Sequence, residues 1–369
     1  MRLGWVELLL IVASLAAAGF LFAWSGLFNI AASTGHWAVT EVALHWAMRR
    51  SVETHSAGIA APDLSGLALQ QRGAGHYQTG CAPCHGAPGA PQNAVAAAMT
   101  PAPPDLQQTV PEWEDRELFW IVRHGVKFTG MPAWPAQQRA DEVWALAAFL
   151  RRLPDLDAGS YRALAFGEAV PAAGGGDAAL AGLGGPVEAA LTDCSRCHGR
   201  DGRGRASGAF PLIGGQQQEY LQEALEAFAS GGRHSGFMEP AAARVDPAVR
   251  RQLAAHYAAR EWAPPAPAEA PDPTLVAAGR ALAEEGAPSR RIPACLSCHG
   301  AAALERNPGY PRLDGQPEGY LATQLRLWRE GERGGGPFAP VMHKVGIALE
   351  PEDIAAAAAY FASWTGERP

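Results

Sequence analysis

The sequence predicts an all-α protein in which one N-terminal transmembrane helix precedes three helical domains of similar size. The chain of 369 residues contains the pentapeptide Cys-x-x-Cys-His three times, with first cysteines 113 and 101 residues apart. A charge-free apolar stretch lies near the N-terminus. Elsewhere, segments that begin with an acid or proline carry apolar residues at helical spacing, most clearly 141–150, 246–257 and 351–361. We find no convincing ladder of strands.

The N-terminal stretch is long enough to cross a membrane. Residues 8–40 contain no Asp, Glu, Lys or Arg, and the apolar core from Leu8 to Trp24 approaches the roughly 20 residues that span the hydrocarbon. Trp5 and Trp24 are candidates for the two membrane interfaces. A cleaved signal peptide is the alternative, because Ala16–Ala18 are small, but apolar residues continue beyond them. We therefore expect an uncleaved anchor.

The segment after the anchor, residues 36–48, is too short for a second span. It mixes Trp37, Val42 and Leu44 with polar residues, so we expect a helix that lies in the membrane interface. Positive charges flank the predicted span on both sides, at Arg2 and at 49–50. The positive-inside rule therefore does not fix the orientation.

The three pentapeptides indicate covalent haem. In a c-type haem site two thiols add across the porphyrin vinyl groups, and the adjoining histidine becomes the proximal iron ligand. Two cysteines three residues apart lie on one helical turn, which matches the two vinyl groups. We expect three covalently bound haem c groups, with proximal ligands His85, His198 and His299. The attaching cysteines account for every cysteine in the chain: Cys81, Cys84, Cys194, Cys197, Cys295 and Cys298.

Two other uses of Cys-x-x-Cys fit the sequence less well. A zinc ribbon brings two such pairs together around one ion. A thioredoxin-like dithiol needs no histidine after the second cysteine. Here there are three pairs, each followed by histidine and each about one domain from the next. The pattern therefore favours haem over zinc or a redox dithiol.

Shifts in composition divide the chain into six parts. The anchor and the interfacial helix take up residues 1–60, and the first haem domain (unit one) 66–153. A linker that ends in a Gly/Ala-rich stretch, 154–185, leads to the second haem domain (unit two), 186–261. A Pro-rich linker, 262–273, leads to the third haem domain (unit three), 274–369. We expect the first linker to be flexible, especially over 172–185, and the Pro-rich linker to be stiff.

Units two and three are internal repeats. Pro211-Leu-Ile-Gly-Gly-Gln216 matches Pro311-Arg-Leu-Asp-Gly-Gln316, a Tyr-Leu pair follows four residues on, and an arginine lies thirteen residues beyond each tyrosine. Over residues 186–364 the chain resembles the dihaem cytochrome c4 family. That family packs two haem edges about a pseudo-twofold axis, so the resemblance implies that units two and three form one block. The Gly-rich stretch 172–185 has neither the apolar periodicity nor the charge pattern of a docked helix, so we expect unit one to move relative to that block.

Unit one resembles a class I cytochrome c domain of the kind found in oxidase subunits. The resemblance rests on Pro104-Asp105-Leu106 and on Gly130-Met131-Pro132-Ala133-Trp134. Both resemblances imply three class I-like cytochrome c domains. They also imply haem attachment outside the cytoplasm, so we expect a single-pass protein of the bacterial inner membrane with its haem domains on the periplasmic side.

The sixth iron ligand decides whether a haem carries electrons or reacts with a substrate. Met131, Met238 and Met342 lie one in each unit, 40 to 46 residues after the proximal histidine. A thioether ligand closes the coordination sphere and raises the iron potential, which suits electron transfer. We expect these three methionines to be the distal ligands. The alternative is that each merely fills a gap in a core.

Other candidate ligands are histidines. His124, His234 and His343 lie near the three methionines and would give bis-histidine haems of lower potential, although we expect them to be exposed or to contact propionates. Met99 is a further alternative in unit one, but it lacks the sequence context of the family's ligand loop.

Two arginines are candidates for contact with the haem propionates. Arg233 and Arg333 occupy equivalent positions in the repeated units, and a planar guanidinium suits bidentate binding of a carboxylate. Each arginine could instead be an ordinary surface residue. We expect Tyr220 and Tyr320 to pack in the cores.

The resemblances imply a membrane-anchored trihaem cytochrome c that transfers electrons in a respiratory chain, to or within a terminal oxidase system, and that has no catalytic residues. The expected donor is a quinol-oxidising complex or a periplasmic dehydrogenase, and the expected acceptor a terminal oxidase or a soluble cytochrome. The alternatives are a cytochrome subunit of a periplasmic dehydrogenase and a multihaem redox enzyme with one labile haem ligand. The net charge of −7 provides no basic surface for nucleic acid.

Overall fold

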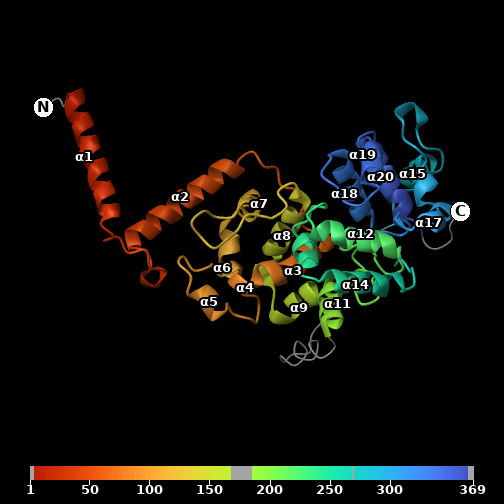
Figure 1. The fold of residues 1–369 in the computed structure, drawn as a ribbon, viewed down its shortest axis with the longest axis horizontal. Coiled ribbons are helices and arrows are strands. Elements are labelled where there is room, and N and C mark those ends of the chain that lie inside the picture. The colour runs from red at the N-terminus through yellow and green to blue at the C-terminus, as the bar shows by residue number, and fades with distance from the viewer. Residues whose placement is uncertain (1–3, 168–184, 268–269, 365–369) are drawn as a thin grey trace.

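The computed structural model describes residues 4–167, 185–267 and 270–364. Within these ranges every named element is a helix, and strand pairing is limited to two isolated β-bridges. The all-α prediction is therefore confirmed. Helix α1 (Trp5–Trp24) projects from one end of a helical body, and the helices of the last third of the chain lie toward the other end (Figure 1).

Helix α1 has no buried residue. Among the described residues it is the one helix that is long and apolar enough, by length and composition, to cross a membrane. The short 3-10 helix η1 (Ala32–Thr34) follows it. The Thr100 hydroxyl of unit one donates a hydrogen bond to the Ala32 carbonyl at 2.7 Å, so η1 contacts the first haem domain.

Helix α2 (Ala38–Ser56) is longer than the expected interfacial helix. Its N-terminal half is largely exposed, whereas Val52 and Ser56 in its second half are buried against unit one. Arg49 forms an ion pair with Glu112 at 2.9 Å, and its guanidinium lies 4.5 Å from the centre of the Trp113 ring. The charge at position 49, expected to flank the membrane span, therefore lies inside a helix that docks on unit one.

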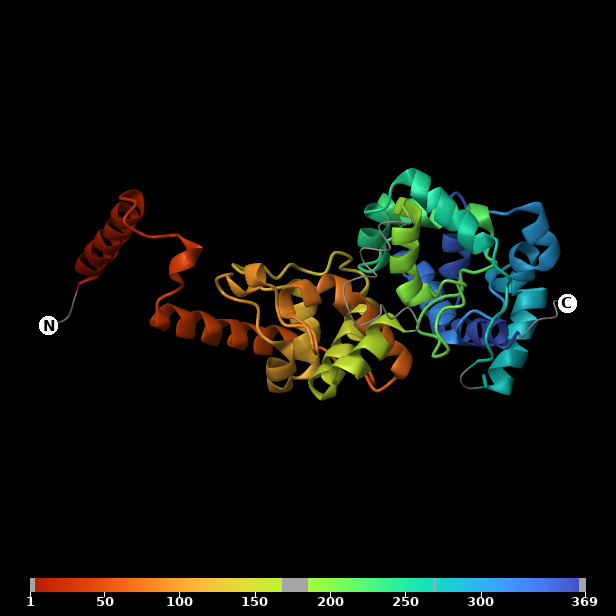
Figure 2. The same cartoon turned by 90° about the horizontal axis from the view of Figure 1, so that it is seen from below.

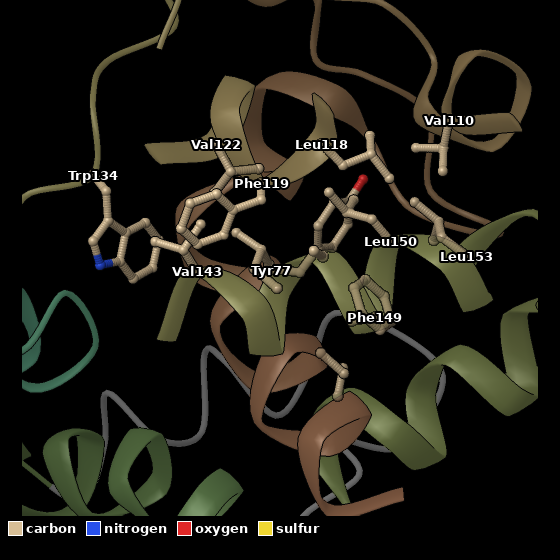
Figure 3. Packing of buried hydrophobic residues seen from close by; sticks show 14 of the residues in the cluster. Tyr77, Val110, Leu118, Phe119, Val122, Trp134, Val143, Phe149, Leu150 and Leu153 are labelled. Atoms are coloured by element: carbon tan, nitrogen blue, oxygen red, sulfur yellow. The ribbon is translucent and has the colours of Figure 1, made fainter. Parts of the chain in front are cut away.

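Unit one is built on the crossing of its first and last long helices, α3 (Leu67–Gly80) and α8 (Ala140–Arg152). Helix α7 (Asp115–His124) packs beside α8. Figure 3 shows Tyr77 and Phe149 meeting between α3 and α8, with Phe119 from α7 on the other side. Three short helices carry the haem motif and the loops around it: α4 (Ala82–His85), α5 (Ala94–Ala97) and α6 (Leu106–Thr109).

Unit one extends further along the chain than expected. Helix α9 (Ala158–Phe166) packs on α3, with Tyr161 and Ala165 buried in the unit-one core. The Tyr161 hydroxyl donates to Gln78 at 2.5 Å. This part of the expected linker is therefore a packed helix, because its apolar residues find a surface on α3. Most of the expected Gly/Ala-rich stretch lies outside the described residues.

Units two and three repeat the plan of unit one. In each, the first helix packs against the last: α11 (Gly185–His198) against α14 (Pro247–Ala258), and α15 (Pro273–Glu285) against α20 (Pro351–Ala362). The three last helices predicted from periodicity are present. Between its first and last helices, unit two contains α12 (Gln218–Ala229) and α13 (Met238–Ala243). Unit three contains α16 (Leu296–His299), α17 (Ala301–Arg306), α18 (Glu318–Arg329) and α19 (Ala339–Gly346) in the same place.

Units two and three meet through a reciprocal pair of glutamines. The Gln316 side chain accepts a hydrogen bond from Leu212 N at 3.0 Å and donates to Leu212 O at 2.8 Å. Gln216 does the same to Arg312, at 2.9 Å and 3.1 Å. Equivalent residues of the repeat thus exchange equivalent bonds, as a pseudo-twofold arrangement requires. The Pro-rich linker joins this interface, because Trp262 stacks under the Arg312 guanidinium at 4.9 Å.

Unit one also contacts unit two, and the expectation that it moves relative to units two and three stays a prediction. The Arg196 guanidinium of unit two donates to the Gly75 carbonyl of unit one at 2.9 Å, in a buried setting. Arg205 donates to the Leu164 carbonyl at 2.5 Å. Figure 2 shows α3 and α9 lying beside the helices of unit two. No local sequence pattern indicates this interface, because it joins residues more than forty positions apart.

Candidate haem sites

Each haem motif lies on one turn of helix, as expected from its spacing. The motif of unit one spans α4 and its N-cap Cys81, that of unit two ends α11, and that of unit three spans α16 and its N-cap Cys295. The backbone amides of His85 and His299 donate to the carbonyls of Cys81 and Cys295, both at 2.9 Å. None of the six cysteines forms a disulfide. The helical turn therefore presents both thiols and the imidazole from one short segment.

Each of the three predicted proximal histidines makes an equivalent hydrogen bond that the sequence analysis missed. The Nδ1 atom of His85 lies 2.9 Å from the carbonyl oxygen of Pro104. The equivalent distances are 3.3 Å from His198 to Pro211 and 2.9 Å from His299 to Pro311. With Nδ1 as the donor, the lone pair of Nε2 is free to bind iron, and the ring orientation is fixed. The signal was present, because each proline begins a motif already used for the resemblances.

Burial keeps these imidazoles neutral. It lowers the pKa of His85, His198 and His299, although the hydrogen bond to the proline carbonyl acts in the opposite direction. A neutral imidazole is the form that binds a metal. The three histidines are therefore both oriented and correctly protonated for axial ligation.

The first cysteine of each motif lies in surroundings that oppose ionisation of its thiol. Burial raises the pKa of Cys81 and of Cys194 to about 12 and that of Cys295 to about 11. Reactive dithiols and zinc ligands need the opposite shift, toward the thiolate. The first cysteine of each motif therefore lies in surroundings unlike those of a reactive dithiol.

The three candidate methionines occupy corresponding places. Met131 lies in the loop between α7 and α8, Met238 begins α13, and Met342 lies in α19. All three are partly buried, whereas the competing histidines are exposed: His124, His234 and His343. This difference favours thioether ligands, and the assignment stays a prediction.

Met99 lies closer to the ligand loop of unit one than expected. Its methyl carbon is 2.2 Å from the position that a Cβ on Gly130 would occupy. Met99 therefore packs directly beside the residue that precedes Met131, and a side chain at position 130 would have to displace its methyl group. Two thioethers lie at this one loop, so Met99 remains the competing ligand in unit one.

The repeated arginines and tyrosines form crossed pairs between units two and three. Arg333 donates to the Tyr220 hydroxyl at 3.3 Å, and Arg233 donates to the Tyr320 hydroxyl at 3.5 Å. Burial opposes ionisation of Tyr220, but the positive charges of the two arginines outweigh burial and lower its pKa. The tyrosines, expected to be core residues, therefore serve as hydrogen-bond acceptors at the interface.

The arginine pair also tests whether haem fits this chain. Burial and the positive charge of Arg233 lower the pKa of Arg333. Among the described residues, no carboxylate forms an ion pair with either guanidinium. Two partly buried cations close together repel each other unless anions approach them. Haem propionates supply such anions and suit the guanidinium fork, so the arginine pair fits a haem protein.

Helical motifs with paired cysteines, histidines oriented by proline carbonyls and partly buried methionines define a c-type cytochrome. Comparison with known proteins gives the same class. Residues 68–150 match the family described as cytochrome c oxidase, cbb3-type, subunit III.

Known relatives match about half of this chain. The thiosulfate dehydrogenase electron acceptor of Thiomonas intermedia is 34% identical over 180 residues, which cover 48% of this chain and 80% of that protein. Cytochrome c4 of Pseudomonas aeruginosa is 32% identical over 186 residues, which cover 50% and 87%. The chain belongs to the c-type cytochromes, which carry covalent haem c. About half of it is a dihaem domain like cytochrome c4.

Solved structures give matches of the same extent. Cytochrome c4 of Acidithiobacillus ferrooxidans is 28% identical with a TM-score of 0.41, and the match covers 47% of this chain and 99% of that one. The thiosulfate dehydrogenase of Marichromatium purpuratum is 38% identical with a TM-score of 0.41, and the match covers 48% of this chain but only 36% of that one.

Proposed function

We propose that this chain is a membrane-anchored trihaem cytochrome c that transfers electrons in a respiratory chain, to or within a terminal oxidase system. The observation that carries the proposal is the threefold recurrence of a Cys-x-x-Cys-His turn whose histidine is held by a proline carbonyl. The ligand pairs are His85 with Met131, His198 with Met238 and His299 with Met342. When bound, haem supplies the one-electron chemistry.

The residues of units two and three support electron sharing between their haems. The Pro211 carbonyl accepts a hydrogen bond from the His198 ring. The backbone amide and carbonyl of the next residue, Leu212, both bond to the Gln316 side chain. The same arrangement links His299 to Gln216 through Pro311 and Arg312. Both proximal loops are therefore parts of one hydrogen-bonded frame. A rigid frame keeps the distance between two redox centres constant and needs little rearrangement when an electron moves.

The N-terminal helix supports a membrane location. Helix α1 is apolar and exposed along its whole length, and burying such a surface in lipid is favourable. We propose that α1 is retained as a single span in the bacterial inner membrane and that the haem domains are periplasmic, where covalent haem c is attached. The contact of Thr100 with Ala32 would then hold unit one close to the membrane.

The comparisons support different partners for the two ends of the chain. The match of residues 68–150 to an oxidase subunit family supports a terminal oxidase as the acceptor for unit one. The relatives named as thiosulfate dehydrogenase electron acceptors support a periplasmic dehydrogenase as the donor for units two and three. The second candidate function is therefore that of a cytochrome subunit of such a dehydrogenase.

Stopped-flow kinetics with the purified full-length protein test both functions. Intact mass should first show three haems bound to each chain. We expect the reduced protein to be reoxidised by a haem-copper oxidase with uptake of oxygen, and the oxidised protein to be reduced by a thiosulfate dehydrogenase in the presence of thiosulfate. Reduction by the dehydrogenase without any turnover by oxidases would favour the second candidate. Rapid reduction by thiosulfate alone would instead indicate an enzyme and overturn both.

A further inference from the structure

A buried carboxylate of unit one holds a loop of unit two. Glu142 on α8 is only 2% exposed. Its two oxygens accept hydrogen bonds from the Ser235 hydroxyl and from the Gly236 backbone amide, each at 2.6 Å. Both donors are themselves buried. A short bond to an ionisable acceptor in a buried setting is among the stronger hydrogen bonds of proteins, so Glu142 fixes the loop at two adjacent residues.

Arg139, one helical turn before Glu142, holds the same loop at a third residue. Its Nη1 atom donates to the His234 carbonyl at 2.9 Å and lies 3.0 Å from Glu142 Oε1. Its Nε and Nη2 atoms bind the Asp141 carboxylate at 2.8 Å and 3.0 Å. The arginine is therefore held in place and joins the carboxylate to the loop.

Two aromatic side chains of unit one pack against Phe237, the next residue of the loop. Phe237 stacks on His76 with ring centres 4.9 Å apart and meets the Trp134 ring edge-on at 5.5 Å. Trp134 belongs to the core of unit one and lies at one edge of the packed cluster in Figure 3. It approaches so closely that a Cβ on Gly236 would lie 2.3 Å from its ring. A side chain at position 236 would therefore clash with this ring.

The held loop leads directly into the predicted iron ligand of unit two. The Ser235 hydroxyl that donates to Glu142 also accepts hydrogen bonds from the amides of Phe237 and Met238, at 3.2 Å and 3.0 Å. One hydroxyl thus connects a carboxylate of unit one to the first turn of α13. The path from Glu142 to Met238 consists of two hydrogen bonds.

We propose that Glu142 is a positioning residue for Met238, so that the haem of unit two keeps its methionine ligand firmly bound only while unit one is docked. The proposal rests on the proposed function, in which Met238 is that ligand. Without Glu142, a buried hydroxyl and a buried amide lose their acceptor, which favours a loop conformation that reaches water. Partners that orient a metal ligand tune its binding, and here the partner belongs to a different domain.

This arrangement couples the two domains. If Met238 binds iron more firmly with unit one docked, then ligation of the haem in unit two favours docking by the same free energy. A partner protein that separates the units would loosen the ligand of one haem and thereby lower its potential, because a bound thioether stabilises the reduced iron. Unit one would then regulate the electron carrier of unit two.

Cyanide binding to the ferric full-length protein measures how readily each methionine leaves its iron. We expect E142A to raise the rate of cyanide binding about tenfold or more at one haem of the three. E142Q keeps a carbonyl oxygen as one acceptor and should give a smaller increase. S235A removes the connecting hydroxyl and should also act on one haem, which covers the case in which E142A does not fold.

The matched control is E117A. Glu117 is also a nearly buried carboxylate of unit one, at 7% exposed, but it accepts from the Glu114 amide within the same helix at 2.8 Å. We expect this variant to bind cyanide at the wild-type rate. If E142A and S235A also keep the wild-type rate, or if all three haems become faster together, Glu142 is only an interface residue and the proposal is wrong.

The variant M238A separates this proposal from the ligand assignment on which it rests. M238A should remove one of the methionine–iron charge-transfer bands in the near infrared. If M238A removes that band while E142A and S235A leave cyanide binding unchanged, the positioning role alone fails. If M238A changes no band, the assignment of Met238 fails, and the positioning role fails with it.

Discussion

Gly73 on α3 faces the backbone carbonyl of Ala145 on α8 with no room for a side chain between them. A Cβ at position 73 would lie 2.1 Å from the Ala145 oxygen and 2.7 Å from the Phe149 Cβ. Unit three repeats the contact, since a Cβ at Gly279 would lie 2.0 Å from the Ala356 oxygen. In both units the first and last helices therefore cross with their backbones in close contact.

We expect G73A to lower the free energy of unfolding of unit one by about 1–3 kcal/mol, because an added methyl group must push two helix backbones apart. G279A should destabilise unit three in the same way. Denaturant titration followed by circular dichroism and by the haem Soret band measures both effects. The control is G319A on α18, where nothing lies within 4 Å of the added atom and alanine should be neutral or stabilising. Equal stability of G73A and G319A would contradict the proposed role of the crossing.

We expect the folded protein to become less stable in acid because of the buried imidazole of His76. Burial, assisted by the positive charge of Arg196, lowers the pKa of His76 to about 4 in the folded protein. The unfolded chain has the ordinary value of about 6.5. Between these values the unfolded state binds a proton that the folded state excludes, so stability falls as the pH drops from about 6.5 to about 4. The loss amounts to at most about 3 kcal/mol.

We expect H76F to remove most of this pH dependence, because phenylalanine keeps a ring against Trp134 and Phe237 but binds no proton. Urea unfolding at several pH values between 4.5 and 7.5 compares the slopes. H45F is the control, since His45 is exposed on α2 and should leave the slope unchanged. A slope that is the same in wild type and H76F would show that other groups cause the acid sensitivity.

The three distal ligands have a direct spectroscopic test. Near-infrared or magnetic circular dichroism spectra of the ferric protein should show methionine–iron charge transfer for three haems. Replacing Met131, Met238 or Met342 by alanine should remove one third of the intensity in each case. M99A should leave the spectrum intact, and loss of the unit-one signal in M99A rather than M131A would assign Met99 instead. A majority of bis-histidine signal would contradict all three assignments.

The anchor is tested by fractionation and by mass. We expect the mature protein to retain residues 5–24 and to stay with membranes after a high-salt wash, because salt weakens surface ion pairs but not hydrophobic burial. A variant in which a cleavable signal peptide replaces residues 1–35 should be released into the periplasm with its haems attached. A mature N-terminus near Gly19, or full release by salt, would instead indicate a cleaved signal peptide.

Much of this protein follows from short stretches of sequence. The spacing of Cys81, Cys84 and His85 places all three on one turn, because helix geometry is local. The apolar periodicity of the last helix of each unit, and the matching prolines and glutamines of units two and three, are also local patterns. These patterns were enough to predict the all-α class, the repeated units and the c-type cytochrome family.

Only the tertiary structure decided how the units meet. Glu142 and Ser235 are 93 positions apart, and Arg333 and Tyr220 are 113 positions apart. Nothing in either sequence neighbourhood indicates these pairs, because each of these side chains is equally compatible with an exposed surface. The same reason explains why α9 was expected to be a linker and why no contact between units one and two was expected. A buried hydrogen bond is satisfied by a partner in space, and the folded chain alone determines which partner is near.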